Sequence, residues 1–252
     1  MSELDAANIA FETTEDRILG GRVVLRQPAT GYRAAIDPVL LAAAVPAKAG
    51  AQVLDLGCGA GAAALALAAR MPDIRVTGLE RDPDMAQLCQ ANIDANAMGR
   101  RVTVLAGDLL DPLPEVTAGG FDHVMANPPH LDPARADLSP DRGRRAANAE
   151  GAATLTDWVA AALAAVKHKG WITLIHRADR LDALIAAFAG QAGGITILPL
   201  WPKAGASAKR VILRARKGVH SPSVMLPGLV LHVNGGYTAA AEAILRDAAP
   251  LG

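Results

Sequence analysis

The sequence predicts an α/β fold whose sheet is mostly parallel and covered by helices on both faces. Three observations lead to this prediction. From Ala51 onward, short apolar segments alternate with longer amphipathic ones, which is the pattern of strands and helices in βαβ units. The strand segments are apolar throughout, as in sheets buried on both faces. The last two strand patterns, GITILPL and KRVILRAR, have no helix between them, so we expect an antiparallel hairpin at one edge.

Before this alternation, residues 1–50 are expected to form a small prefix of a β-hairpin and a helix that packs on the core. The first 17 or so residues are acidic and are expected to be frayed. Short strands are expected around Leu19 and over residues 23–26. A helix is expected to begin near Asp37, because Pro38 suits the first position of a helix after an acidic cap.

The predicted core covers residues 51–217. Its further strands are expected at QVLDLG, IRVTGLE, RVTVLAGD, FDHVMA and GWITLIH, and its helices at AGAAALALAARM, PDMAQLCQANIDANAM, TLTDWVAAALAAVK and RADRLDALIAAFAG. The polar, basic linker over residues 131–151 is longer than most loops in a compact domain, so we expect it to be functional or mobile. Residues 218–252 are expected to add a strand and a short helix as a C-terminal extension.

Composition and cysteine content favour a soluble, cytoplasmic protein. Of the 252 residues, 51% are hydrophobic, which is enough for a substantial core. Cys58 and Cys89 are too few for a disulfide framework and lack the spacing of a metal site, so we expect buried side chains in a reducing compartment. No basic start followed by an apolar run is present, and the apolar stretches are too short to cross a membrane.

The formal net charge is zero, but the charges are unevenly distributed. Residues 1–133 hold 10 Lys or Arg against 17 Asp or Glu, a balance of −7. Residues 134–217 hold 14 against 6, a balance of +8. Such an excess is either a solvated face or a contact surface for an anionic partner such as RNA.

A glycine-rich turn follows the first core strand and leads directly into a helix. In DLGCGAG, Asp55 ends the strand, and the glycines at 57, 59 and 61 can adopt positive φ and let a ligand approach the backbone. The spacing is not that of the dinucleotide motif G-x-G-x-x-G, which makes a nicotinamide or flavin enzyme the less natural interpretation.

The next two strands also end in carboxylates that suit an adenosine-containing ligand. Glu80 closes the second strand, 21 residues after Gly59, where a carboxylate can accept hydrogen bonds from two ribose hydroxyls. Asp108 follows the third strand and could bind an adenine amino group, with Leu109 packing on the ring. Either carboxylate alone could be a helix-capping or turn residue, but successive strands with ligand-compatible ends indicate a binding site.

The fourth strand ends in Asn127, Pro128, Pro129 and His130. Two consecutive prolines donate no backbone hydrogen bonds and fix φ twice, so this segment forms a rigid ledge that is rich in hydrogen-bond acceptors.

Together these segments resemble the class I S-adenosylmethionine-dependent methyltransferases. DLGCGAG resembles their cofactor loop, and NPPH resembles the (D/N)PP(Y/F/W) motif of amino-methyltransferases. Nearly the whole chain is similar to bacterial tRNA adenine-N6 methyltransferases that modify the adenine next to the anticodon of a valine tRNA, for instance in GGRVVLRQPATGYRAAIDPVLLAA and GWITLIHRADRL. The resemblance implies a Rossmann-like fold with a seven-stranded sheet, and a segment around Arg33 and Asp37 over the methionine end of S-adenosylmethionine.

The resemblance also implies a reaction. Asn127 Oδ1 and the carbonyl of Pro128 would accept hydrogen bonds from an exocyclic amine, with no metal or covalent nucleophile required. His130 departs from the family, which prefers an aromatic ring to stack on the extruded base. This departure puts the substrate in doubt more than the cofactor.

The nature of the methyl acceptor stays open at this point. tRNA is favoured by the basic excess, and the nominal phosphate contacts are Arg142, Arg144, Arg145, Lys209 and Arg210. The alternatives are the glutamine amide of a release factor, guanine N2, and a non-catalytic module that keeps the cofactor fold. A monomer and a homodimer are both compatible with the sequence.

Overall fold

The computed structural model describes residues 10–31, 33, 35–111, 113–129 and 153–251. Its centre is a ten-stranded sheet in the order β12-β11-β8-β9-β7-β6-β3-β4-β5, with β10 pairing β8 off this path. The strands β3 to β7 run parallel, and β9 is antiparallel to both β7 and β8. The mostly parallel α/β fold is thus confirmed.

The parallel part of the sheet alternates with helices as the hydrophobic pattern predicts. Its strands are β3 (Gln52–Leu56), β4 (Arg75–Glu80), β5 (Val102–Ala106), β6 (Phe121–Ala126) and β7 (Val166–Arg177). The helices that follow them are α2 (Ala62–Arg70), α3 (Pro83–Ala95), the short α4 (Pro114–Thr117), α6 (Leu155–Ala165) and α7 (Leu181–Phe188), the last preceded by a 3₁₀ turn over Ala178–Arg180. The antiparallel strands β8 (Ala192–Lys203) and β9 (Arg210–Lys217) come last in this part.

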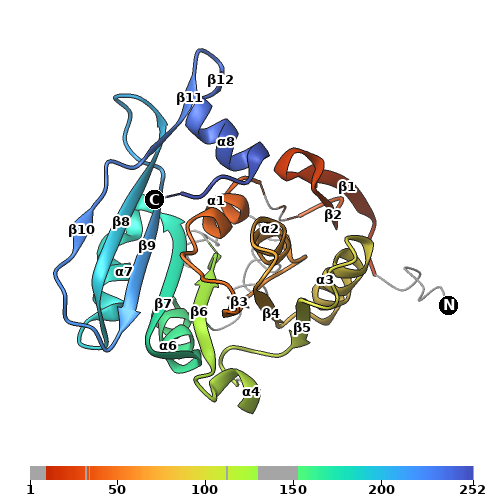
Figure 1. Ribbon diagram of the computed structural model, residues 1–252, viewed down its shortest axis with the longest axis horizontal. Helices are drawn as coiled ribbons and strands as arrows, with labels where there is room; N and C mark the ends of the chain where they lie inside the picture. The colour runs from red at the N-terminus through yellow and green to blue at the C-terminus, as the bar shows by residue number, and fades with distance from the viewer. Residues whose placement is uncertain (1–9, 32, 34, 112, 130–152, 252) are drawn as a thin grey trace, which may run out of the picture.

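Buried apolar side chains form one cluster on each face of the sheet. Leucines and alanines of α1 (Asp37–Ala43), α2, α3 and α8 (Ala239–Asp247) cover one face, and α4, α6 and α7 cover the other. Figure 1 shows α1, α2 and α8 on the opposite side of the sheet from α6. This two-sided burial explains the continuous apolar runs of the core strands. Among the described residues, no helix is long and apolar enough to cross a membrane.

The N-terminal prefix differs in detail from the sequence prediction. The hairpin pairs β1 (Thr13–Ile18) with β2 (Val23–Pro28), so the chain is ordered as a strand from Thr13, within the stretch expected to be frayed. Leu19 lies in a 3₁₀ turn (Leu19–Gly21) with φ 51° and not in a strand. The predicted helix start is confirmed, because α1 begins at Asp37 with Pro38 in its first turn, but the expected cap is wrong: Ile36 is the N-cap residue and Asp37 lies inside the helix.

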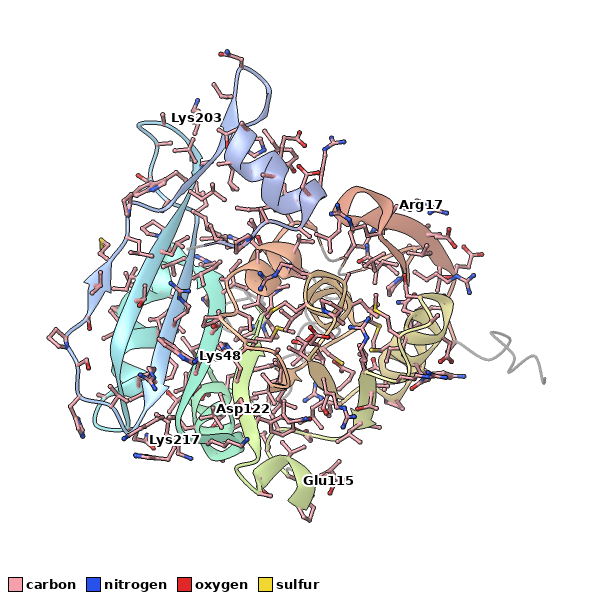
Figure 2. The ribbon with its side chains drawn as sticks, viewed as in Figure 1. Arg17, Lys48, Glu115, Asp122, Lys203 and Lys217 are labelled. Atoms are coloured by element: carbon pink, nitrogen blue, oxygen red, sulfur yellow. The ribbon has the colours of Figure 1, made fainter. Side chains whose placement is uncertain are left out.

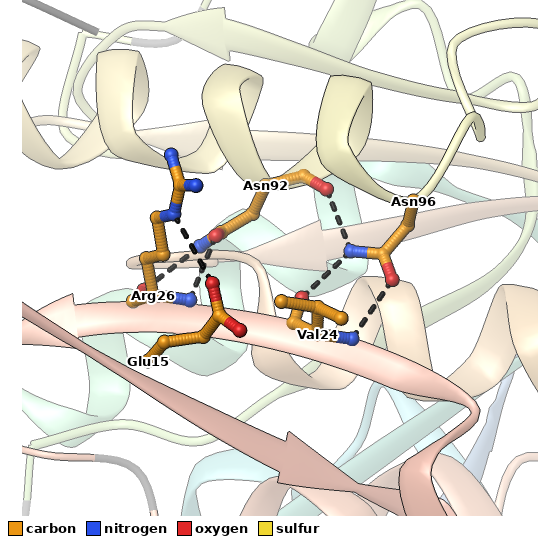
Figure 3. A network of polar contacts seen from close by, with 5 residues as sticks. All are labelled: Glu15, Val24, Arg26, Asn92 and Asn96. Carbon is orange, nitrogen blue, oxygen red and sulfur yellow. Dashed lines mark hydrogen bonds and ion pairs between the residues drawn. The ribbon is translucent and has the colours of Figure 1, made fainter.

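The hairpin is held to the core by Asn92 of α3 and by Asn96, the C-cap residue of this helix (Figure 3). Asn96 accepts a hydrogen bond from Val24 N at 2.9 Å and donates one to Val24 O at 2.7 Å. Asn92 does the same for Arg26, at 2.8 and 2.9 Å. The side-chain amides thus satisfy the free edge of β2 in the way that a neighbouring strand would. Asn92 also donates to Ala60 O at 2.9 Å, which links the hairpin to the glycine-rich turn.

The C-terminal extension corrects the expected position of the antiparallel hairpin. β11 (Leu229–Val233) pairs parallel to β8, and β12 (Gly236–Tyr237) and β10 (Val224–Met225) also belong to this sheet. The β8–β9 hairpin is therefore internal, and the sheet has more than the seven strands expected. Behind it, Leu251 N donates to Ala43 O at 2.9 Å, which brings the end of the chain against α1.

Candidate functional site

The candidate site lies at the carboxyl ends of the parallel strands, where the order of the strands reverses. β3 lies between β4 and β6, so successive crossovers leave β3 in opposite directions, and open α/β sheets bind ligands at such a point. A pocket opens here, and its lining comes from β2, α1, α2, α3 and the ends of β3 and β6. It is lined by Gln27, Pro28, Pro38, Asp55, Gly57, Cys58, Gly59, Ala60, Ala62, Ala63, Met85 and Asn127.

The three glycines of the turn after β3 have different roles. All have positive φ, at 71°, 55° and 86° for Gly57, Gly59 and Gly61. A Cβ on Gly57 would lie 2.3 Å from the Trp158 ring, and one on Gly61 would lie 2.7 Å from Cys89 Sγ. At Gly59 the nearest atom would be 3.8 Å away. Gly57 and Gly61 are therefore required for packing, whereas Gly59 leaves space in the pocket for a ligand.

Asp55 is a buried carboxylate at the bottom of this pocket, with 2% of its surface exposed. Burial raises the pKa of its carboxyl group to about 7, although a hydrogen bond from Ala64 N opposes this rise, and the charge of Glu80 adds to it. Its Oδ2 atom accepts no hydrogen bond from the described part of the chain. Such an acceptor suits a ligand that brings its own donor or positive charge.

Glu80 ends β4 and fixes the glycine-rich turn. Its Oε2 accepts a hydrogen bond from Gly59 N at 2.8 Å, and its Oε1 accepts one from Asp82 N at 2.9 Å. Because a carboxylate oxygen has two acceptor sites, these contacts leave Glu80 able to bind hydroxyls as well.

Asp108 lies beyond β5 and forms a turn. Its Oδ1 accepts from Leu110 N at 2.9 Å, and its Oδ2 is 4.0 Å from Arg81 Nη1. Leu109, next to it, is half-buried against the apolar cluster of α4, α6 and α7. Asp108 is thus both a turn residue and a partly exposed carboxylate at the edge where the ligand is expected.

Asn127 and Pro128 follow β6 and border the pocket. Asn127 is half-buried and lines the pocket, Pro128 is buried and Pro129 is exposed. The structure therefore brings the asparagine of the Pro-Pro segment together with the glycine-rich turn, as predicted from the sequence. His130 lies outside the described residues.

The N-terminal prefix supplies a wall of the pocket, of which the sequence analysis identified only the segment around Arg33 and Asp37. Gln27, 4% exposed, and Pro28 come from β2, and Pro38 comes from α1. Asp16 Oδ2 accepts hydrogen bonds from Gln27 Nε2 at 2.9 Å and from Arg33 Nη2 at 2.6 Å. Arg33 is therefore anchored to β1, beside a pocket-lining residue but not in the lining itself.

Asp37 is also placed beside the pocket and not in its lining. Its Oδ2 accepts a hydrogen bond from Arg210 Nε at 2.8 Å. A residue expected over the cofactor thus pairs with one expected to bind RNA, and this contact joins α1 to β9.

Basic residues in and next to β8 and β9 lie at both ends of the sheet. Lys209 and Arg210 lie where β9 begins, beside the end of β7, at the same end as the candidate site. Figure 2 shows Lys203 at this end, and Lys217 at the other, near Asp122. Arg142, Arg144 and Arg145 lie outside the described residues. Within the part of the chain that is described, no three His, Cys, Asp or Glu side chains gather as metal ligands would.

Comparisons with known proteins show similarity to methyltransferases. Residues 34–139 match the family model described as the methyltransferase small domain. A tRNA1(Val) (adenine(37)-N6)-methyltransferase of Porphyromonas gingivalis strain W83 is 34% identical over 164 residues, which cover 63% of this chain and 64% of that protein. This chain thus spans slightly less than two thirds of the length of that relative.

Two further similarities concern other acceptors. A release factor glutamine methyltransferase of Geobacter sulfurreducens is 39% identical over 81 residues, which are 32% of this chain and 27% of that protein. The crystal structure of a predicted O-methyltransferase from Agrobacterium tumefaciens is 28% identical, with a TM-score of 0.71 over 85% of this chain and 98% of that one. Residues 34–139 are thus similar to the methyltransferase small domain, and the chain has a Rossmann-like methyltransferase fold.

Proposed function

We propose that this protein is an S-adenosylmethionine-dependent N-methyltransferase that methylates N6 of an adenine in tRNA, next to the anticodon. The observation that carries the proposal is the shared pocket: Asn127, which would hold the acceptor nitrogen, lines the same space as Gly57 and Gly59 of the turn that would hold the cofactor. A methyl donor and an exocyclic amine can meet there.

The residues of the pocket fit S-adenosylmethionine. Gly59 leaves room beside its backbone, and Asp55 Oδ2 offers a buried acceptor that suits the ammonium group of the methionine part. Glu80 would bind the ribose hydroxyls, and Asp108 with Leu109 would lie beside the adenine. Arg33 and Asp37 would act from the wall over the methionine end. When bound, the cofactor supplies a methyl group that its sulfonium already activates.

The chain itself would prepare the acceptor nitrogen. The lone pair of an exocyclic amine is delocalised into the ring, so the nitrogen is a weak nucleophile until its N–H groups are engaged. Asn127 Oδ1 and the carbonyl of Pro128 would accept these two hydrogen bonds, and Pro129 keeps the segment rigid. Such acceptors favour a pyramidal nitrogen, hold it in line with the donor and stabilise the positive charge that develops on it. By its position in the sequence directly after Pro129, His130 would contact the base.

The choice of tRNA rests on the named relative and on charge. The relative from Porphyromonas gingivalis is a tRNA adenine-N6 methyltransferase, and residues 134–217 of this chain carry an excess of eight positive charges, 14 against 6. An anionic substrate is therefore favoured over a neutral protein amide. We expect a cytoplasmic enzyme, either monomeric or homodimeric, in which residues 51–217 form the catalytic core and residues 1–50 and 218–252 flank it.

The second candidate is methylation of a glutamine amide in a release factor. The 81-residue match to such an enzyme favours it, because an amide nitrogen needs the same two acceptors. Transfer of labelled methyl groups from S-adenosylmethionine to unmodified tRNA and to a release factor, compared side by side, separates the two. Labelled tRNA supports our proposal, whereas a labelled release factor with unlabelled tRNA replaces it with the second candidate.

A further inference from the structure

One face of the sheet carries a group of cationic and polar side chains outside the pocket. We call it the Arg214 face, and it consists of Trp171, Thr173, Thr196, Arg214 and Arg216. In the strand register Arg214 of β9 lies between Thr173 of β7 and Thr196 of β8, and Arg216 lies opposite Trp171. Because side chains two residues apart point to the same side of a strand, these residues share a face with Ile212, which packs under α1 and α2.

Arg214 is half-buried and has no described hydrogen-bond or ion-pair partner. Burial removes part of the hydration of its guanidinium and lowers the pKa of this group. A guanidinium in such surroundings is normally paired, because an uncompensated charge is costly there. Among the described residues, no carboxylate is recorded as a partner of this guanidinium. His123 is buried, and burial together with the positive charge of Arg214 lowers its pKa to about 3, so it is neutral, with Nε2 2.8 Å from Thr173 Oγ1.

Arg216 extends the positive charge of this face. Its guanidinium lies over the Trp171 ring, 5.0 Å from the centroid, and donates to Lys169 O at 3.1 and 3.0 Å. These contacts fix the guanidinium without neutralising it. The Arg214 face therefore presents two arginines, the hydroxyl of half-buried Thr196 and an aromatic ring, and no carboxylate among its members, whereas Thr173 is buried against His123.

We propose that the Arg214 face binds a phosphate group of the tRNA backbone, with Arg214 as the principal contact. The planar guanidinium fork suits two phosphate oxygens, and the hydroxyl of Thr196, opposite Arg214, can donate to a third. This inference rests on the proposed function. The inference adds a tRNA contact surface to the catalytic site. Arg214 is two strands away from β6 and lies a few residues before the level of Asn127, so standard strand spacings place the two residues about 12 Å apart.

The test compares Arg214→Gln with Arg75→Gln, a control that removes one exposed positive charge at the start of β4, on the other side of β3. Binding of tRNA is measured over a salt series. Arg214→Gln should weaken binding by about tenfold at low salt and reduce the log–log salt slope by about 0.7–0.9, whereas Arg75→Gln should change both little. Cofactor affinity and kcat at saturating tRNA should be preserved in both variants.

Further measurements separate a loss of tRNA contact from a loss of folding. Arg214→Gln should unfold at the same or a higher temperature than the wild type, because a poorly solvated charge is removed. If this variant does not fold, Arg214→Lys is measured in its place. It should keep the salt slope, because the positive charge remains, but bind tRNA more weakly, because the guanidinium fork is lost. Equal binding by wild type and Arg214→Gln, with tRNA still methylated, overturns this inference alone. Absence of tRNA binding by the wild type overturns the proposed function with it.

Discussion

At the scale of single residues, Asn127 should separate chemistry from binding. Asn127→Ala removes one preoriented acceptor for the substrate amine but leaves Gly59, Glu80 and Asp55 in place. We expect turnover to fall by about 100-fold or more, while S-adenosylmethionine affinity stays within a few-fold. Calorimetry and steady-state kinetics on the same preparations measure both quantities. Parallel losses of affinity and turnover would show that Asn127 mainly terminates β6.

Asp55 should make the free energy of unfolding depend on pH. Its pKa in the folded protein is about 7, against an ordinary value of 3.8, so the folded state binds the extra proton between these values and becomes less stable as pH rises through this range. Above pH 7 the ionisation of Asp55 lowers the free energy of unfolding by its full amount, at most about 4 kcal/mol. Asp55→Asn removes it, so the variant should gain more thermal stability at pH 8 than at pH 4. An equal shift at both values would contradict the assigned pKa.

The same carboxyl group should control cofactor affinity. A positively charged ammonium group favours ionised Asp55, so S-adenosylmethionine should bind more weakly as pH falls below 7, by up to about tenfold per unit. In Asp55→Asn, affinity should be lower at pH 8 and should depend less on pH between 6 and 8. Titration calorimetry in buffers of matched ionic strength measures this. A wild-type affinity that is constant between pH 6 and 8 would exclude Asp55 from ligand binding.

Much of the site could be predicted from sequence because its residues follow strand ends. Asp55, Gly57, Glu80, Asp108 and Asn127 lie at the carboxyl ends of parallel strands, which meet at one edge of the sheet, and Asp55, Gly57 and Asn127 among them line the pocket. Gln27, Pro28 and Pro38 could not be found in this way. They reach the pocket through the packing of the hairpin on α3 and of α1 on the sheet, contacts that join distant parts of the chain.

At the scale of elements, Asn92 and Asn96 should hold the N-terminal hairpin on α3. Asn92 is fully buried and bonds Arg26 N, Arg26 O and Ala60 O, so Asn92→Ala leaves three backbone groups without partners. We expect a loss of about 2–4 kcal/mol in unfolding free energy. Asn96→Ala, at a half-buried position, should cost less. Urea unfolding of the two variants checks this order.

Docking of the hairpin should also affect the ligand pocket. Because β2 carries Gln27 and Pro28, Asn92→Ala should weaken S-adenosylmethionine binding even under conditions where the variant is folded. Fluorescence or calorimetric titration well below its unfolding midpoint tests this. Unchanged affinity in a destabilised Asn92→Ala would mean that the hairpin is not a wall of the cofactor site.

Physical reasons explain why the sequence analysis misplaced some elements. β1 reads TTEDRI and is largely exposed, so it is stabilised by pairing with β2 and not by an apolar face. Leu19 is apolar and 3% exposed, yet it lies in a turn next to Gly20 and Gly21. The pattern LVLHV at β11 is visible in the sequence, but its parallel pairing with β8 depends on a long-range contact. The long core strands and helices, by contrast, keep one pattern of apolar residues over many positions, so the sequence predicts them.

At the scale of the whole molecule, the contact between Asp37 and Arg210 joins the prefix to the closing strands. The two residues are 173 positions apart, and their charged atoms are 2.8 Å apart at a partly buried site. A double-mutant cycle with Asp37→Asn and Arg210→Gln should give a coupling free energy of about 1–2 kcal/mol, larger than that of an exposed pair. Urea unfolding in low and high salt measures it. Additive effects would show that α1 and β9 are not coupled through this pair.

The central claim is that this fold transfers a methyl group to adenine N6 in tRNA. The direct measurement is mass spectrometry of nucleosides from unmodified tRNA after incubation with S-adenosylmethionine and either the wild-type protein or Asn127→Ala. The account predicts N6-methyladenosine at the position next to the anticodon with the wild type, and about 100-fold less with the variant under initial-rate conditions. Wild-type product that is absent from tRNA, or methylated at another atom, or formed equally by Asn127→Ala, would contradict it.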